Sequence, residues 1–369
     1  MKSILKRIEK ECNASFKIQI SGINFELNCQ EERKKLIGND MFQYLPRNAE
    51  YKKINVLSTK GAKIYYIIDN LLFEEMRIEN YNKDFKSIVV YQKRTFCKGA
   101  YFYDYGKIRV FFCEQEPYYV CTIEDKIYVI LCDYTKNLNR LYFRLMLEFI
   151  LRAKELMGYH LIHAASVSID NKGLLICGEK GAGKTTLMSH LLNSGKANFI
   201  ANDKVFLSPD LSTLEYFPIV ARIGEGTLRK FAKYDLQNHY HRISEEEKKI
   251  EKENLGNDKW NFTPVEMAKI FSCEYKSMES FVAVLFSKIG KDTNESLIPV
   301  DGDVLQFDLF LSGSMKVENW LLNDEWIEYY SNMFHIQPIN NHIKYKSYEI
   351  NYNYDSESNS IVNDICKIL

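Results

Sequence analysis

The sequence has no excess of charge of either sign. Its 49 Lys and Arg residues balance 49 Asp and Glu residues, and no long run of Lys or Arg stands out. Proteins that bind nucleic acid by electrostatic attraction usually carry a basic surface. The composition therefore argues against a nucleic-acid partner.

Paired cysteines are also missing. The nine cysteines are scattered, with no CxxC pair and no Cys/His spacing typical of zinc sites. Residues 1–15 alternate charged and apolar side chains at helical spacing and lack the continuous apolar run of a signal peptide. We expect neither disulfides nor structural zinc, and a cytoplasmic protein.

No apolar run long enough to span a membrane is free of charge. The longest, residues 140–159, contains Arg144, Glu148 and Arg152, which are costly inside a bilayer. Arg144 and Glu148 are four residues apart and can pair on one face of a helix. The segment predicts a buried helix and no membrane span.

The length of the chain favours two domains. With 369 residues, of which 46% are hydrophobic and 14% aromatic, it can bury more than one typical core. Short alternating segments between residues 15 and 135, separated by turn residues, predict a β-rich first half. We expect residues 1–158 to form a β-rich N-terminal domain with a connecting helix, and residues 159–369 to form a second domain. The fold class is α/β, or α+β.

Individual elements can be placed more finely. The pattern predicts strands at residues 53–59 and 280–289, a charged helix at 244–256, a helix at 320–334, and a closing strand and helix within 347–369.

The segment GLLICGEKGAGKTTLMSHLL, residues 173–192, joins an apolar strand to a helix through a glycine-rich loop. Glycine lets the backbone turn sharply and direct its N–H groups at an anion. Gly178, four further residues, Gly183, Lys184 and Thr185 fit the phosphate-binding loop pattern. The sequence predicts a nucleotide site made by Gly178, Glu179, Lys180, Gly181, Ala182, Gly183, Lys184, Thr185 and Thr186.

The loop pattern assigns chemistry to particular residues. Lys184 should neutralise the β- and γ-phosphates, and the Thr185 hydroxyl should coordinate Mg²⁺. Asp203, at the end of the next apolar strand, is the expected second metal ligand. The predicted cofactors are ATP, with GTP as an alternative, and Mg²⁺.

The stretch from His163 to about Leu207 resembles the catalytic domain of the bacterial HPr kinase/phosphorylase family and its looser HPr kinase-like relatives. The resemblance rests on a histidine before the loop (His163), the loop itself, Gly195, and a strand that ends in Asn202 and Asp203. It implies a P-loop domain of the fold shared with phosphoenolpyruvate carboxykinase. It also implies a kinase that transfers the γ-phosphoryl group of ATP to a serine of a peptide or protein.

The resemblance implies catalytic roles for Lys184, Asp203, Asn202 and His163. Asn202 stands where the family has the first of two aspartates, the one expected to act as base toward the serine. His163 is either that base, a phosphate contact or a packing residue. The glycine-rich signature of the bifunctional enzymes is absent, so neither the reverse reaction nor HPr as substrate is expected.

Several alternatives stay open at this stage. The chain could be a nucleotide-gated binding module or an ATPase without kinase activity, and the acceptor of a kinase could be a small molecule. Arg222 either stabilises the transferring phosphoryl group or makes a structural ion pair. Relatives of this fold often form oligomers, so the resemblance allows a homo-oligomer.

Overall fold

The computed structural model of the chain describes residues 1–46, 61–92, 95–113, 118–133, 141–231, 259–290, 294–300, 345–353 and 360–369. The described part is a mixed α/β structure with eight helices and two large sheets. The predicted elements at 53–59, 244–256 and 320–334 lie outside the described residues. The predicted strand at 280–289 and the closing strand and helix are confirmed.

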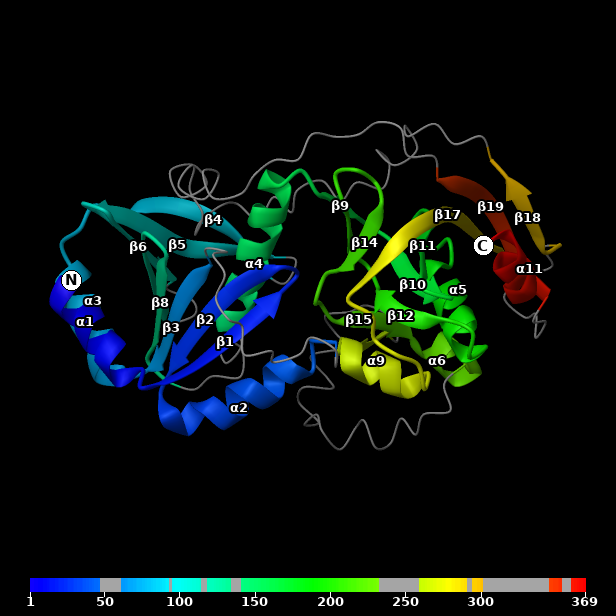
Figure 1. Cartoon of the computed structure of the whole chain (residues 1–369). Helices are drawn as coiled ribbons and strands as arrows, with labels where there is room; N and C mark the ends of the chain where they lie inside the picture. The colour runs from blue at the N-terminus through cyan, green and yellow to red at the C-terminus, as the bar shows by residue number, and fades with distance from the viewer. Residues whose placement is uncertain are drawn as a thin grey trace. The chain divides into compact units, whose positions relative to one another are not determined.

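The chain divides into two compact units (Figure 1). Of the described residues, the first unit holds those of Met1–Met41 and Glu50–Met157. The second holds those of Phe42–Ala49, Gly158–Ser312 and Gln337–Leu369.

The first unit is built on an eight-stranded sheet with the order β1-β2-β3-β8-β7-β6-β5-β4. β2, β3 and β8 are parallel, and the other neighbours are antiparallel. The strands are β1 (Ala14–Ile20), β2 (Ile23–Cys29), β3 (Ala62–Ile68), β4 (Lys86–Gln92), β5 (Thr95–Tyr105), β6 (Ile108–Cys113), β7 (Tyr118–Ile123) and β8 (Lys126–Leu131).

Helices cover both faces of this sheet, which is therefore the middle of three layers. α1 (Lys2–Glu11) and α3 (Asn70–Asn80) pack on one face, in a core that includes Ile67. α4 (Leu141–Leu156) contacts the other face through Tyr142, whose ring meets Tyr66 at 5.2 Å. Tyr66 and Ile67 are successive residues of β3, so their side chains point to opposite faces. Among the described residues, this unit also contains α2 (Glu31–Phe42).

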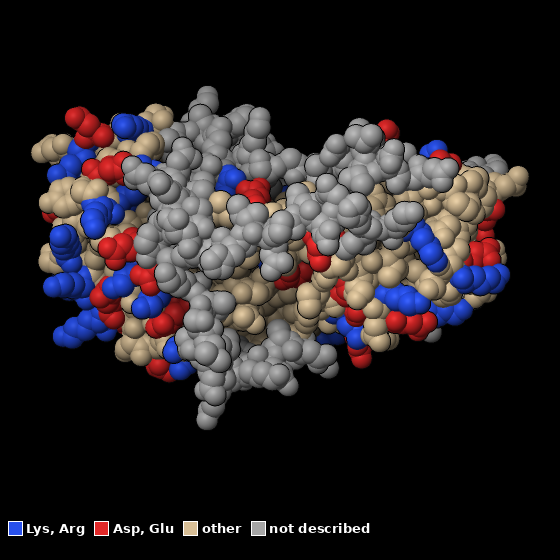
Figure 2. Space-filling view, turned by 45° about the horizontal axis from the view of Figure 1, so that its top comes forward, with Lys and Arg blue, Asp and Glu red and all other residues tan. Residues whose placement is uncertain are grey.

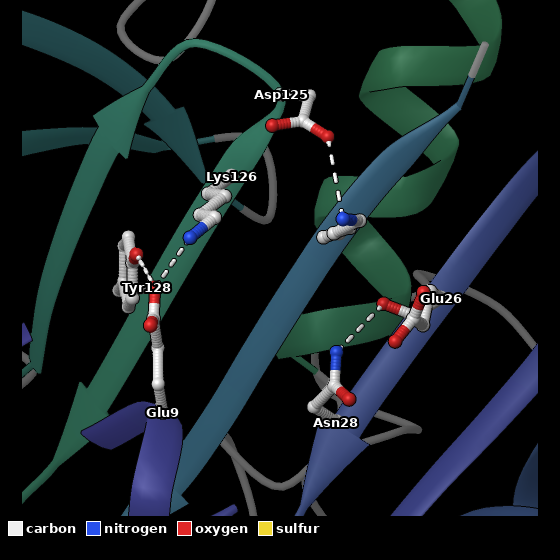
Figure 3. Close-up of polar contacts among 7 residues, drawn as sticks. Glu9, Glu26, Asn28, Asp125, Lys126 and Tyr128 are labelled. Carbon is white, nitrogen blue, oxygen red and sulfur yellow. Dashed lines mark hydrogen bonds and ion pairs between the residues drawn. The ribbon is translucent and has the colours of Figure 1, made fainter. Parts of the chain in front are cut away.

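Polar contacts fasten α1 to the sheet (Figure 3). The Glu9 carboxylate accepts hydrogen bonds from the Lys126 ammonium at 2.6 Å and the Tyr128 hydroxyl at 2.5 Å. Lys63 on β3 and Asp125 in the turn between β7 and β8 form an ion pair at 3.9 Å. These groups are all occupied in holding the unit together, so we assign them a structural role.

α4 confirms the predicted buried helix. Most of its apolar side chains are buried, and Arg144 Nε lies 3.5 Å from Glu148 Oε1. Among the residues that the structure describes, no helix has the length and apolar character needed to cross a bilayer.

Glu148 predicts a pH dependence of α4. Burial raises the pKa of Glu148 to about 7, against the opposing charges of Arg144 and Arg152. A carboxyl group whose pKa is raised by folding contributes its full stability below its ordinary pKa, and that contribution is lost as pH rises through about 7. Glu148→Gln should therefore remove a decline of up to about 3 kcal/mol in the stability of α4 between pH 5 and pH 8.

Hydrogen exchange of the α4 amides in the full chain measures this effect, with variant and wild type compared at each pH. The control is Glu155→Gln, on the same helix, where Glu155 bonds Arg152 at 2.7 Å. It should keep the wild-type decline. Equal declines in the wild type and Glu148→Gln would contradict the prediction.

The second unit contains a nine-stranded sheet. Seven strands follow the order β12-β10-β11-β17-β14-β13-β9, and β19 pairs with both β17 and β18. The strands are β9 (His160–Ile162), β10 (Ala165–Ile169), β11 (Lys172–Cys177), β12 (Asn198–Ala201), β13 (Val205–Leu207), β14 (Thr213–Tyr216), β17 (Met278–Gly290), β18 (Ser296–Pro299) and β19 (Lys346–Asn353).

A separate ribbon and four helices make up the rest of the described part of this unit. The ribbon pairs β15 (Ala221–Gly224) with β16 (Lys259–Phe262) in antiparallel fashion. The helices are α5 (Lys184–Asn193), α6 (Glu225–Phe231), α9 (Pro264–Ile270) and α11 (Ser360–Ile368). On the face of the molecule in Figure 2, basic and acidic side chains lie interspersed, in keeping with the balanced composition.

Candidate functional site

The predicted site residues gather at one end of the second sheet because of the directions of three strands. β10 lies between β11 and β12 and is antiparallel to both. The glycine-rich loop follows β11, Asn202 and Asp203 follow β12, and His163 lies two residues before β10 begins. The start of an antiparallel strand lies beside the ends of its neighbours. Three segments that are separate in sequence therefore meet at one edge.

The loop has the backbone conformation for which its glycines are needed. Gly178, Gly181 and Gly183 have φ angles of 152°, 90° and 87°, which side chains with a Cβ rarely adopt. Gly183 is the N-cap of α5. The first N–H groups of a helix have no partner within it, so the loop and α5 present donors suited to an anion.

β17 supports the loop from beside β11. Its residue Phe286 pairs with Cys177, the last residue of β11, so Ser287 to Gly290 extend alongside the loop. The Ser287 hydroxyl donates to the Ala182 carbonyl at 2.7 Å. A Cβ on Gly183 would lie 2.7 Å from the Cβ of Ile289. The loop is thus held by a strand about 100 residues away in the chain.

Two glycines of the loop form a matched pair for mutation. Gly181 and Gly183 have nearly the same φ, but a Cβ on Gly181 would meet no atom within 4 Å. We expect Gly183→Ala to lower the unfolding free energy by about 1 to 3 kcal/mol more than Gly181→Ala, because only Gly183→Ala adds a clash to the backbone strain. Calorimetry of both variants measures the difference. Equal losses of unfolding free energy would show that the Ile289 side chain moves aside at no cost and would contradict the prediction.

Lys184 bends back over the loop. Its ammonium donates to the carbonyls of Gly178 at 2.7 Å and Glu179 at 3.1 Å. Burial lowers the pKa of Lys184, and the nearby charge of Lys259 lowers it further, while Cys177 and Asp203 act in the opposite direction. The charge predicted to meet phosphate therefore lies at the loop itself.

The two threonines after Lys184 contact different elements. The Thr185 hydroxyl donates to the Asn202 amide oxygen at 3.2 Å, and the Thr186 hydroxyl lies 3.3 Å from that of Thr227 on α6. Sequence reasoning expected Thr185 to share a metal with Asp203, whereas the structure places Asn202 in contact with Thr185.

The oxygen atoms of this region suit Mg²⁺. Thr185 and Asn202 offer a hydroxyl and an amide oxygen, and Asp203 a carboxylate, all of the hard type that Mg²⁺ prefers. Within the described residues, no group of three or more His, Cys, Asp or Glu side chains could hold a metal alone. Mg²⁺ usually takes only one or two protein ligands when phosphates and water supply the rest, so the residues fit that ion.

Asp203 contacts His163. Its Oδ1 lies 3.2 Å from His163 Nε2, and the two side chains are 41% and 51% exposed, so solutes can reach both. Asp203 has a φ of 75°, a left-handed conformation that Asp tolerates better than most residues. Burial acts to raise the pKa of Asp203, but the hydrogen bond of His163, the charge that His163 carries when protonated, and the charges of Lys204 and Arg222 outweigh it. Its pKa therefore lies below the ordinary value, and the carboxylate stays ionised at neutral pH.

Three further cations affect the pKa values of Asp203 and Lys184. Lys204 is half-buried, and its pKa is lowered by burial and by Arg222, against the effect of Asp203. The charge of Lys259 lowers the pKa of Lys184. Sequence reasoning considered Arg222 but missed Lys204 and Lys259. The position of Lys204 beside Asp203 was a usable signal, whereas nothing in the sequence brings Lys259 to the loop.

The remaining predicted loop residues lie at the surface. Glu179, Lys180 and Gly181 are exposed, and Ala182 is half-buried. The structure thus joins the predicted residues in two contacts, Thr185 with Asn202 and Asp203 with His163, beside the loop. Their roles in binding and catalysis stay predictions.

No protein-family model and no curated protein matches the chain. Among solved structures, it is similar to the HPr(Ser) kinase/phosphatase from Coxiella burnetii. The TM-score is 0.24 with 14% sequence identity, and the match covers 56% of this chain and 92% of the other. A TM-score this low carries no conclusion about shared fold or activity.

Proposed function

We propose that the chain is an HPr kinase-like phosphotransferase that uses ATP and Mg²⁺ to phosphorylate a hydroxyl group, that of a serine in a peptide or protein. The observation that carries the proposal is the meeting of the glycine loop, the Thr185–Asn202 pair and the Asp203–His163 pair at one sheet edge. A kinase needs a phosphate cradle, oxygen ligands for a metal and a group that handles the proton of the acceptor. Each is represented among these residues.

The loop and Lys184 would hold the phosphates. Backbone N–H groups of the loop and the start of α5 would donate to the phosphate oxygens, and the Lys184 ammonium would exchange its two carbonyl partners for them. Thr185 and Asp203 would hold Mg²⁺, with Asn202 beside them. The ion, when bound, neutralises charge on the β- and γ-phosphates.

Three side chains beyond the loop, those of Asn202, Asp203 and His163, would act on the acceptor hydroxyl. Its oxygen forms a bond to the γ-phosphorus while the bond from that phosphorus to the bridging oxygen of ADP breaks, and ADP leaves with the electron pair. An amide cannot accept a proton at neutral pH, so Asn202 would only orient the hydroxyl. The proton would pass to His163, whose imidazolium the Asp203 carboxylate stabilises.

Asn202 also favours a second candidate function. The resemblance leads us to expect a carboxylate at its position, and without it the chain could bind nucleotide and a partner without transferring phosphate. In this second function the nucleotide would control binding of the partner, or its hydrolysis would be coupled to that binding.

Incubation of the protein with γ-labelled ATP, Mg²⁺ and a lysate of the organism that encodes it separates these functions. A labelled acceptor that is absent with Lys184→Ala supports the kinase. Release of free phosphate alone indicates an ATPase. ATP that binds but stays intact indicates the nucleotide-gated binding module.

A further inference from the structure

The β15–β16 ribbon has one buried and one open face. Arg222 pairs with Asn261 and Gly224 with Lys259, so these four residues share a face. Arg222 and Lys259 are exposed on it. The other face is buried, with exposures of 4% or less for Ala221, Ile223, Trp260 and Phe262. The buried face thus packs the ribbon against the rest of the unit, and the open face presents two cations.

Within the described part of the chain, the three cations beside the site lack a direct polar partner. Lys204, Arg222 and Lys259 make no hydrogen bond or ion pair with any residue that the structure describes. Elsewhere in the same unit basic side chains are paired, as Arg229 is with Glu225 and Lys276 with Glu274. Lys204 and Arg222 act to lower the pKa of Asp203, which already contacts His163. The described part of this region therefore has an excess of positive charge.

The open face of the ribbon belongs to the same region as the loop. Gly224 leads directly into α6, and Thr227 in the first turn of α6 lies 3.3 Å from Thr186 in the first turn of α5, measured between the hydroxyl oxygens. The ribbon that carries Arg222 and Lys259 therefore leads into a helix that contacts the first turn of α5, directly after the glycine-rich loop.

We propose that Arg222 and Lys259 bind a carboxylate of the acceptor, close to the hydroxyl that is phosphorylated. This inference rests on the proposed function and specifies its substrate class, an acidic peptide or protein segment. Diagonal neighbours across an antiparallel pair are about 7 to 8 Å apart, so long side chains at these positions can bracket one small anion. The guanidinium fork of Arg222 matches a carboxylate in a bidentate manner. Carboxylates are the ordinary anions of an unmodified peptide, whereas Lys184 and the loop serve the nucleotide phosphates.

Two small phosphate esters test the proposal. O-Phospho-L-serine and O-phosphoethanolamine both carry a phosphate and an ammonium group and differ by one carboxylate. Their affinities are measured by calorimetry on the full chain saturated with ADP and Mg²⁺. We expect phosphoserine to bind about tenfold more tightly to the wild type, the effect of one charge-assisted hydrogen-bonding group. Arg222→Gln and Lys259→Gln should each reduce this preference while ADP still binds.

The control variants remove cations that have partners in the same unit. Arg229→Gln removes the exposed partner of Glu225, and Lys196→Gln removes a side chain that donates to Asn363 at 2.6 Å. Both should keep the wild-type preference. Equal affinity for the two esters, or no detectable binding of either to ADP-loaded protein, overturns the inference and leaves the proposed function standing. Failure of the wild type to bind ADP overturns the proposed function and the inference with it.

Discussion

Lys184→Ala is expected to abolish the rise in melting temperature that ATP and Mg²⁺ produce in the wild type. Lys184 is the predicted phosphate-binding cation, and its described contacts are two loop carbonyls, so its loss should remove binding and leave the fold intact. A ligand at 100 times its Kd stabilises the folded state by about 2.7 kcal/mol. The wild type should therefore show a clear shift at millimolar ATP, measured by calorimetry.

The matched control for this prediction is Lys180→Ala. Lys180 lies in the same loop and is exposed, and it makes no hydrogen bond or ion pair with a described residue. The predicted contribution of Lys180 to the site is its backbone N–H, which alanine keeps, so this variant should retain the shift apart from a small loss due to the removed surface charge. An unchanged melting temperature of the wild type with ATP and Mg²⁺ would refute the nucleotide site, and an unchanged shift in Lys184→Ala would refute the role of that lysine.

Asp203→Asn should reduce phosphoryl transfer by about 10²- to 10⁴-fold and remove its dependence on Mg²⁺ concentration. The substitution keeps the size of the side chain, and Asn tolerates the φ of 75° as well as Asp does. It removes the carboxylate proposed both to hold the metal and to stabilise the His163 imidazolium. Transfer rates from labelled ATP across a Mg²⁺ titration measure both effects.

The control carboxylate is Asp170, which also has a positive φ, of 50°, and lies in the turn between β10 and β11 at the opposite end of these strands. Asp170→Asn should leave the rate unchanged. Asn202→Ala should have a milder effect than Asp203→Asn, because it removes an orienting group, and His163→Gln should alter the pH profile of the rate. Full activity in Asp203→Asn would remove the proposed metal site.

Much of the fold could be predicted from local pattern. The alternating segments at Ala62–Ile68 and Tyr118–Ile123 are strands, and the apolar helix with an internal Arg144–Glu148 pair is α4. The helices α2 and α3 were missed. They lie among strands, and their short, charged sequences resemble turns until packing against the sheet decides between the two conformations.

The candidate site likewise has a part that local pattern predicts and a part that depends on distant contacts. The loop could be predicted because the glycines, Lys184 and Thr185 are adjacent in sequence, and their spacing reflects a single local conformation. The effects of Ile289 on Gly183 and of Lys259 on Lys184 could not be predicted, because they depend on strand pairing and on the β15–β16 register. The contact of Thr185 with Asn202 depends on the offset between β11 and β12, which no local pattern encodes.

The support of the loop by β17 has a consequence for the order in which the protein folds during synthesis. The part of β17 that carries Ser287 and Ile289 pairs on its other edge with β19, through Ala283–Gly290 and Lys346–Asn353. A nascent chain that stops before residue 346 holds the whole glycine-rich loop but lacks the strand that flanks its support. Such non-local pairings form slowly and late. We therefore expect nucleotide to assist folding only after Lys346–Asn353 has left the ribosome, well after the residues that bind the nucleotide.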